Sequence, residues 1–295
     1  MNLLTQTSIA VATISAVIVP PAFSQENATE PQSSSLSIGI GFPDTSEPLR
    51  ARAGIGFGVL PDYEGSSDYN AVAFPLVDVK KQGIFFVNGA SINPNNGLAS
   101  AGMTIFHLTH TNGNSQSTQF LLGPFIRAHQ GREQDDNEIL KGLGDIDPSV
   151  GVGIFMTLNT GPLLFNLTAA PHDVGNDNDG FLVSLDAAYT IAVNNNFELS
   201  SNLSTSWADD EYMQSYFGIS NAQATNTGLS QFNSTSGFKD VGISFKATYA
   251  LSKNWIIDGQ LGYWHLLDDA SNSPIVEKEG SENQVRGLVG LSYQF

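Results

Sequence analysis

The sequence predicts an all-β chain that folds as a transmembrane antiparallel β-barrel, and three observations lead to this prediction. Apolar and polar residues alternate along many segments of about ten residues. The last such segment, from Val285 to Phe295, ends on an aromatic residue at the carboxyl terminus. The charged fraction is only 14% and glycine occurs 29 times, which suits a sheet that faces lipid on one side.

The final segment shows the alternation most clearly. One face of an extended strand would carry Val285, Gly287, Val289, Leu291, Tyr293 and Phe295. The opposite face would carry Arg286, Gly290, Ser292 and Gln294, with Leu288 as its one large apolar residue. In outer-membrane barrels the last strand closes the barrel, and its aromatic residues lie in the interfacial girdle.

Charged residues in the middle of predicted strands support a barrel over a soluble sandwich. Lys246 and Asp186 each fall on the polar face of an alternating segment. A charge there would be costly in a dry core. The polar lumen of a barrel accommodates it at little cost.

The chain divides into three parts. Residues 1–24 are predicted to be a signal peptide, because Ile9 to Pro20 is apolar, carries no charge and is too short to span a bilayer. Cleavage is expected between Ser24 and Gln25. Residues 25–49 are predicted to be a periplasmic tail with a short strand near 38–42, and residues 50–295 to be the barrel. The absence of cysteine suits passage through an oxidising compartment.

About twelve strands are predicted, with ten to fourteen compatible with the pattern. Their ranges are 50–60, 70–80, 83–92, 98–108, 118–129, 149–159, 162–170, 180–194, 196–207, 237–251, 254–265 and 284–295. Because the last strand should run toward a periplasmic terminus, the connections sort into two sets. The expected outer set is 61–69, 93–97, 130–148, 171–179, 208–236 and 266–283, and the expected inner set is 81–82, 109–117, 160–161, 195 and 252–253. Long loops fall outside and short turns inside, as in known barrels, and only 109–117 is long for its side.

The net charge and the positions of the aromatic residues indicate which partners the protein can have. A net charge of −17 argues against nucleic acid, which requires a basic surface. The acidic residues concentrate in loops, where they could hold divalent cations beside lipopolysaccharide. The aromatic residues expected at the membrane interface, because they lie at strand ends, are Trp207, Tyr263, Trp264, Tyr293 and Phe295.

Several ordered motifs resemble the MipA/OmpV family of outer-membrane proteins, from about residue 50 to the end. They are Pro61-Asp62-Tyr63-Glu64-Gly65-Ser66, Phe74-Pro75-Leu76-Val77-Asp78, Gly131-Arg132, Leu143-Gly144-Asp145-Ile146-Asp147, Tyr216-Phe217-Gly218-Ile219-Ser220, the stretch from Asp269 through Ser273-Pro274 to Val276, and Tyr293-Gln294-Phe295.

The resemblance implies an outer-membrane barrel that acts as a scaffold, with a lytic transglycosylase and a peptidoglycan synthase as partners. It also implies that Tyr293 and Phe295 belong to a C-terminal assembly signal. The even strand count, the alternation and the sorting of the loops predict that the barrel is monomeric. The loop motifs have a structural interpretation beside partner contact, since their residues favour turns that fold the loops over the barrel mouth. A narrow diffusion channel, closed if a loop such as 208–236 plugs the lumen, is the alternative function.

Enzymatic and metal-binding sites are weaker hypotheses. Asp209-Asp210 and the group of His265 with Asp268-Asp269 would lie near the barrel mouth and could activate a water molecule, but they lack a surrounding motif. Residues 173–180 resemble a calcium loop only in part, and an Asn/Asp/Gly turn explains them better. The sequence therefore predicts no catalytic residue, no cofactor and no metal site. The glycines from Gly54 to Gly58 are expected to make room for side chains in the lumen.

Overall fold

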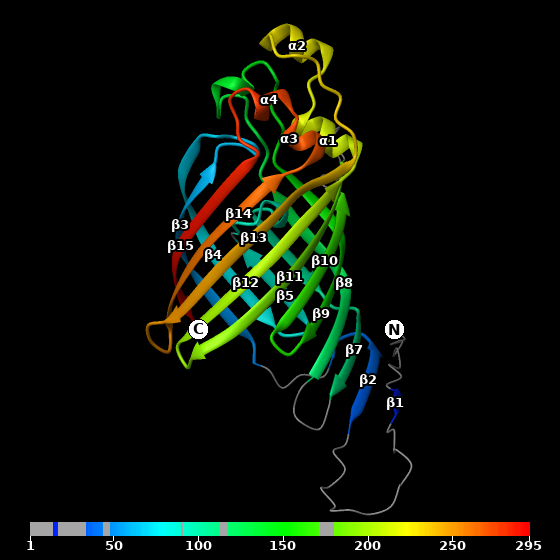
Figure 1. Ribbon diagram of the computed structural model, residues 1–295. Helices are drawn as coiled ribbons and strands as arrows, with labels where there is room; N and C mark the ends of the chain where they lie inside the picture. The colour runs from blue at the N-terminus through cyan, green and yellow to red at the C-terminus, as the bar shows by residue number, and fades with distance from the viewer. Residues whose placement is uncertain (1–13, 17–33, 44–47, 90, 112–116, 172–179) are drawn as a thin grey trace, which may run out of the picture.

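The computed structural model describes residues 14–16, 34–43, 48–89, 91–111, 117–171 and 180–295. Twelve strands form a closed antiparallel barrel, as the sequence predicts (Figure 1). They are β3 (Arg50–Pro61), β4 (Tyr69–Lys81), β5 (Phe85–Gly89), β6 (Ala99–Met103), β8 (Ser117–His129), β9 (Ser149–Thr160), β10 (Leu163–Pro171), β11 (Phe181–Asn194), β12 (Phe197–Ala208), β13 (Gly237–Ala250), β14 (Trp255–Leu266) and β15 (Asn283–Gln294). The ring closes where β15 pairs with β3, so the C-terminal strand completes the sheet.

The alternation places apolar side chains outside and polar ones inside. Ile55, Phe57 and Val59 of β3 are exposed on the outer surface. Lys246 and Asp186 line a cavity in the lumen, as their place on the polar faces predicts. The glycines of β3 face inward, and a Cβ on Gly56 would lie 2.7 Å from the ring of Phe74. These glycines therefore make room for a lumen side chain, as expected.

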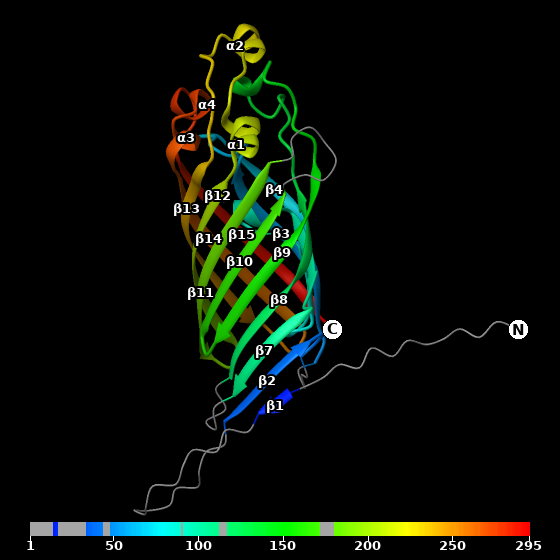
Figure 2. The same cartoon turned by 90° about the vertical axis from the view of Figure 1, so that its right-hand side faces the viewer.

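A small sheet, here called the ledge, continues the wall beyond the barrel (Figure 2). The predicted strand 98–108 is divided near Thr104: β6 pairs with the upper part of β8, while β7 (Phe106–Thr111) pairs with its lower part. β2 (Ser35–Ile40) pairs with β7 and confirms the short strand expected near 38–42. β1 (Ile14–Ala16) pairs with the other edge of β2 and lies within the predicted signal peptide. The ledge is β2, β7 and the lower part of β8.

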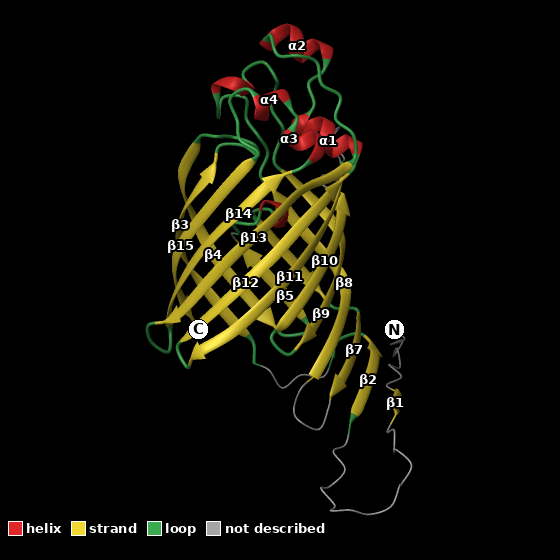
Figure 3. Cartoon of the chain, in the orientation of Figure 1, coloured by secondary structure: helices red, strands yellow, loops and turns green. Residues whose placement is uncertain are grey.

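The all-β barrel carries short helices in its loops, a detail that the period-two pattern does not predict (Figure 3). They are the 3-10 helices η1 (Pro94–Asn96) and η2 (Glu138–Leu140), and the α-helices α1 (Asp210–Phe217), α2 (Asn221–Thr227), α3 (Asp268–Ser271) and α4 (Pro274–Glu277). Asp209 caps α1 by accepting a hydrogen bond from the Tyr212 N–H. Within the described part of the chain, no helix is long and apolar enough to cross a membrane.

The helix-bearing loops pack into one body, here called the cap, over the end of the barrel opposite the C terminus (Figure 1). The cap comprises the described residues of 61–69, 130–148, 208–236 and 266–283. Its apolar core draws on all four loops, with Tyr63, Leu140, Phe217 and Ile275 almost completely buried. The short turns lie at the other end, so the predicted sorting of long and short connections is present in the structure.

Candidate functional site

One loop leaves the wall and enters the lumen. The strand predicted at 83–92 ends at Gly89, and residues 91–98, here called the inner loop, turn inward instead of forming an outer loop. The Asn93 side-chain amide donates to Asp186 Oδ1 at 3.0 Å, and that of Asn95 donates to Asp240 at 3.1 Å. Asp240 lies on β13, across the barrel from β5 and β6 in the strand order. The inner loop therefore spans the lumen, whereas the loop 208–236 covers the mouth from above.

An apolar contact also holds the inner loop, on strands β14 and β15 beside β13. Ile92 packs with Trp264 and Leu288, and Phe74 contacts the same cluster. Trp264 is 1% exposed and donates through its indole N–H to Ser204 Oγ at 3.0 Å. The predicted place of Trp264 at the membrane interface is thus wrong. Its outward neighbour Tyr263 keeps a surface position at 41% exposure.

A buried cluster of charges joins the cap to the wall and to the inner loop. Lys239 forms ion pairs with Glu64 of the cap and, at 3.0 Å, with Asp240 of the wall. Glu64 also accepts from the Tyr212 hydroxyl at 3.4 Å, while Asp240 accepts from Asn95. A register shift between Ser206 and Trp207 of the partner strand turns both Lys239 and Asp240 inward.

The first family motif lies within the cap. Pro61 ends β3, and Asp62 accepts from the Asn137 amide at 3.2 Å. Tyr63 donates to the Ile275 carbonyl at 2.9 Å. Gly65 has a φ of +103°, and a Cβ there would lie 2.5 Å from Val276 Cγ2, so only glycine suits this turn.

The remaining loop motifs fall into two groups. Gly144, Asp145 and Asp147 form an exposed turn, in which Gly144 has a φ of +83° and Asp145 accepts from the Gln134 N–H. The second group joins two loops, because Ser273 donates to the Phe217 carbonyl at 2.6 Å. Gly218 ends α1, and Pro274 begins α4.

Burial shifts the pKa values of three residues in the cap. It raises the pKa of Tyr63, an effect that the charge of Arg132 partly offsets. It also raises the pKa of Tyr212 well above the usual value, with the Glu64 carboxylate adding to the shift. Burial lowers the pKa of Arg132, whose guanidinium donates to the Tyr216 carbonyl at 2.8 Å. These loops form a packed body with hydrogen-bonded polar groups.

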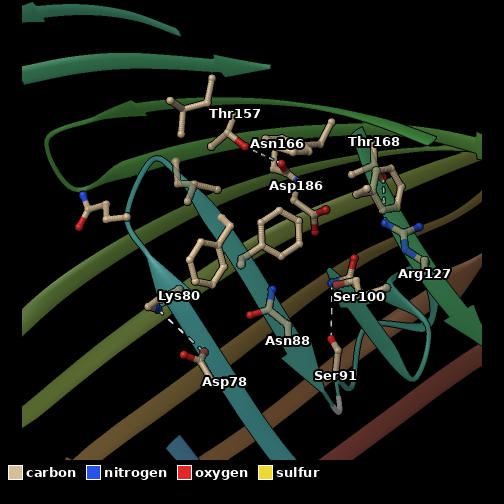
Figure 4. Close-up of a pocket in the computed structure, with 18 of the residues that line it drawn as sticks. Asp78, Lys80, Asn88, Ser91, Ser100, Arg127, Thr157, Asn166, Thr168 and Asp186 are labelled. Atoms are coloured by element: carbon tan, nitrogen blue, oxygen red, sulfur yellow. Dashed lines mark hydrogen bonds and ion pairs between the residues drawn. The ribbon is translucent and has the colours of Figure 1, made fainter. Parts of the chain in front are cut away.

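Below the inner loop the lumen holds a cavity of about 660 Å³. It reaches from the turn at 81–83, near the C-terminal end of the barrel, to Ser91 and Asn96 of the inner loop. Asp78 and Lys80 of β4 and Arg127 of β8 project into this space (Figure 4). Arg127 also donates to the Asn95 carbonyl at 2.6 Å and to Thr168 at 3.2 Å. The cavity and the inner loop above it form the candidate functional site.

Two of the acidic side chains weighed for catalysis, and the histidine beside them, have structural partners. Asp209 caps α1, and Asp269 accepts from the Thr235 N–H at 2.7 Å. His265 contacts Asn283 at 3.1 Å. Among the described residues, no group of three or more His, Cys, Asp or Glu side chains is placed to hold a metal ion. Most of the segment 173–180, weighed as a calcium loop, lies outside the described residues.

The terminal aromatic residues lie on the outer surface of β15 and just beyond it. The Tyr293 ring meets the rings of Trp255 and Phe295 edge to face, with centroids 5.3 Å and 5.2 Å away. The Phe295 N–H donates to the Ala51 carbonyl of β3 at 3.0 Å, while its side chain is 79% exposed. An aromatic group of this kind, at the C-terminal end of the barrel, suits a membrane interface.

The closed twelve-stranded sheet, its apolar outer surface and its polar lumen define an outer-membrane β-barrel. The sequence model described as MltA-interacting protein MipA matches residues 53–295, so the chain belongs to the MipA family. It is 26% identical to the outer membrane protein Omp26La of Vibrio anguillarum over 55% of this chain and 61% of that protein. It is 23% identical to the MltA-interacting protein of Escherichia coli (strain K12) over 35% of this chain and 40% of that protein.

The alignments thus span about three fifths and two fifths of these two relatives. Solved outer-membrane proteins resemble the chain weakly. OprB of Pseudomonas putida aligns with a TM-score of 0.40 and 8% identity, over 84% of this chain and 94% of that one. OmpT of Vibrio cholerae aligns with a TM-score of 0.37 and 9% identity, over 92% of this chain and 100% of that one. The protein is located in the outer membrane.

Proposed function

We propose that the protein is a non-enzymatic scaffold for the machinery that synthesises and hydrolyses peptidoglycan. In this role it binds a lytic transglycosylase and a peptidoglycan synthase on its periplasmic side. Membership of the MipA family supports this role, as does the name of the Escherichia coli relative, MltA-interacting protein. The observation that carries the proposal is the ledge, which extends the sheet beyond the barrel at the C-terminal end.

The ledge has two properties of a docking surface. Its outer face is apolar, and Ile38 and Ile40 of β2 are 38% and 77% exposed. Cleavage after Ser24 would also remove β1 and leave β2 as an edge strand, which can accept a strand of another protein. The placement of the inner loop across the lumen and of the cap over its mouth also supports a scaffold, because both narrow the path through the barrel.

Capture of a lytic transglycosylase tests the scaffold. A variant lacking residues 34–43 loses β2 but keeps all twelve barrel strands. The full protein should retain the enzyme on a column and this variant should not. A variant with Asn226→Ala in the exposed cap helix α2 is the control and should bind normally. Absence of capture by the full protein, or equal capture by the shortened one, would contradict the proposal.

A diffusion channel is the second candidate, and the cavity below the inner loop favours it. The inner loop crosses the lumen through two asparagine side chains, so the double substitution Asn93→Ala and Asn95→Ala should release it. In planar bilayers the scaffold role predicts that the unchanged protein forms no stable open channel. Stable conductance by the unchanged protein would favour transport, and an increase in the double variant would identify the inner loop as the barrier.

A further inference from the structure

The charge of the lumen is opposite to that of the whole chain. The chain has 12 Lys and Arg residues against 29 Asp and Glu. Six of the basic residues, but only three acidic ones, line the main cavity and a smaller one that shares lining residues with it. The basic residues are Arg50, Arg52, Lys80, Lys81, Arg127 and Lys246, and the acidic ones are Asp78, Asp186 and Asp258. Half of the positive side chains thus line these two neighbouring cavities, five of them the main one, where low-dielectric walls strengthen their field.

The three acidic side chains already have partners in the lumen. Arg52 bridges Asp78 at 3.5 Å and Asp258 at 3.2 Å. Lys80 and Lys246 lie near the same two carboxylates, at 3.9 Å and 3.6 Å. Three basic side chains therefore share two carboxylates in this part of the lumen, which leaves a surplus of positive charge.

The third acidic group lies higher, beside the inner loop. Asp186 accepts hydrogen bonds from Asn93 and Asn202, both at 3.0 Å. Arg127 is 5% exposed, and its Nε–H has no hydrogen-bond partner among the described residues. A buried donor without a partner carries a desolvation cost that an anion in the cavity would relieve.

One wall of the same cavity is aromatic. Phe125 and Phe155 are buried among Leu121 and Ala170, and Phe86 meets the Phe155 ring edge to face at 5.4 Å between centroids. The Arg127 guanidinium lies 4.8 Å from the centre of the Phe125 ring, so positive charge and aromatic surface adjoin. The volume of about 660 Å³ is in the usual range for a small-molecule pocket.

We propose that the cavity below the inner loop binds a small organic anion, with a carboxylate or phosphate group near the basic residues and a flat apolar part against the phenylalanine wall. Asn96 and Gly97 of the inner loop line its upper end, so the pocket is blind toward the cap. The occupant enters from the C-terminal end of the barrel. This site does not depend on the scaffold role.

Calorimetry on the full mature protein in a non-ionic detergent tests the proposal. Benzoate is the probe, benzyl alcohol is its neutral counterpart, and phenyl phosphate shows which anionic group binds more tightly. Benzoate should bind at low salt and benzyl alcohol should not. Raising the salt concentration should weaken the binding, because the attraction is electrostatic.

Lys246→Gln removes one charge from the pocket and should weaken benzoate binding about tenfold. Lys80→Gln is a second variant with the same expectation. Lys253→Gln makes the same change in the exposed turn at this end of the barrel and should leave the affinity unchanged. The proposal is wrong if neither anion binds, if benzyl alcohol binds as tightly as benzoate, or if Lys253→Gln weakens binding as much as Lys246→Gln.

Discussion

Lys239 shows how single residues hold the cap to the barrel. Its ammonium group is almost fully buried between Glu64 and Asp240, one from the cap and one from the wall. A buried charge is tolerated only when it is paired, so each of these side chains depends on the others. The ion pair between Lys239 and Glu64 couples strand β13 to the cap, although 175 residues separate the two side chains in the sequence.

Lys239→Met should destabilise the protein by about 3 kcal/mol, because it removes the ion-pair partner of two carboxylates at this buried site. Urea unfolding in detergent micelles measures the change. Lys141→Met is the matched control, since Lys141 pairs with Glu138 on the exposed surface of the cap and such pairs contribute little. Equal stability of the two variants would show that the buried cluster does not hold the cap.

Tyr63 should make the cap sensitive to alkali. Burial raises the pKa of its phenol above the value of about 10 for an unfolded chain. A raised pKa means that the neutral form is stabilised in the fold, so this stability is complete below about pH 10 and declines as the pH rises further. Tyr212 acts in the same direction. Limited proteolysis of the cap at about pH 8 and about pH 11 should show faster cleavage at the higher pH.

Tyr63→Phe separates this effect from general alkaline unfolding. The variant loses the hydrogen bond to the Ile275 carbonyl and should be less stable by about 1 kcal/mol at neutral pH. Its cleavage rate should also change less between the two pH values, since the titrating group is gone. An unchanged pH dependence in this variant would show that Tyr63 is not responsible.

Residue faces are largely predictable from the sequence, and the exceptions have a physical reason. The period of two assigned Lys246 and Asp186 to the lumen because a strand has only two faces. The same period places Trp264 and Tyr263 on opposite faces of the strand. Both are nevertheless predicted at the membrane interface, because aromatic residues at strand ends are assigned there. Gly242 and Gly262 are a readable signal for the buried indole, since a Cβ on either would lie within 2.5 Å of the Trp264 ring.

At the level of elements, the strands are predictable and the inner loop is not. Asn93, Pro94 and Gly97 indicate a turn, but they do not indicate where the turn lies. Its position is set by Asp186 and Asp240, which are 93 and 145 residues away from their partners. The helices escape a periodicity search because each has eight residues or fewer. The capping box of Ser220 and Gln223 before α2 is a local signal that would have identified one of them.

The C-terminal strand β15 is the subject of a second prediction at the level of elements. Its main chain pairs with β14 and β3, while Tyr293 and Phe295 lie outside the barrel and bury little apolar area within it. Deleting residues 293–295 removes two aromatic side chains and the last pairs of the β15 ladder, which should cost a few kcal/mol that the barrel can tolerate. It should nevertheless strongly reduce the amount of assembled barrel, if these residues form the assembly signal. The heat-modifiable band on a gel measures assembly. Tyr263→Ala, which removes an outward aromatic residue from β14, is the control and should assemble normally.

Assembly of the truncated protein at the normal level would show that the terminal aromatic residues only pack at the membrane interface. Loss of assembly in both variants would instead indicate a general need for aromatic residues on the outer surface.

At the level of the whole molecule, strand number and orientation are linked. An even number of strands brings both ends of the barrel chain to one side, and the cap then occupies the other. The ledge, the ring of turns and the mouth of the basic cavity share the side of the C terminus. The scaffold role therefore requires that this side faces the periplasm, and the mouth of the basic cavity would then open on the same side.

Cysteine labelling on intact cells tests this orientation directly, because the chain has no cysteine of its own. Asn272→Cys places a thiol on the exposed surface of the cap, and Ser252→Cys places one on an equally exposed turn at the other end. A membrane-impermeant maleimide should label Asn272→Cys on whole cells and label Ser252→Cys only after the outer membrane is broken. Labelling of Ser252→Cys but not of Asn272→Cys on whole cells would contradict the account.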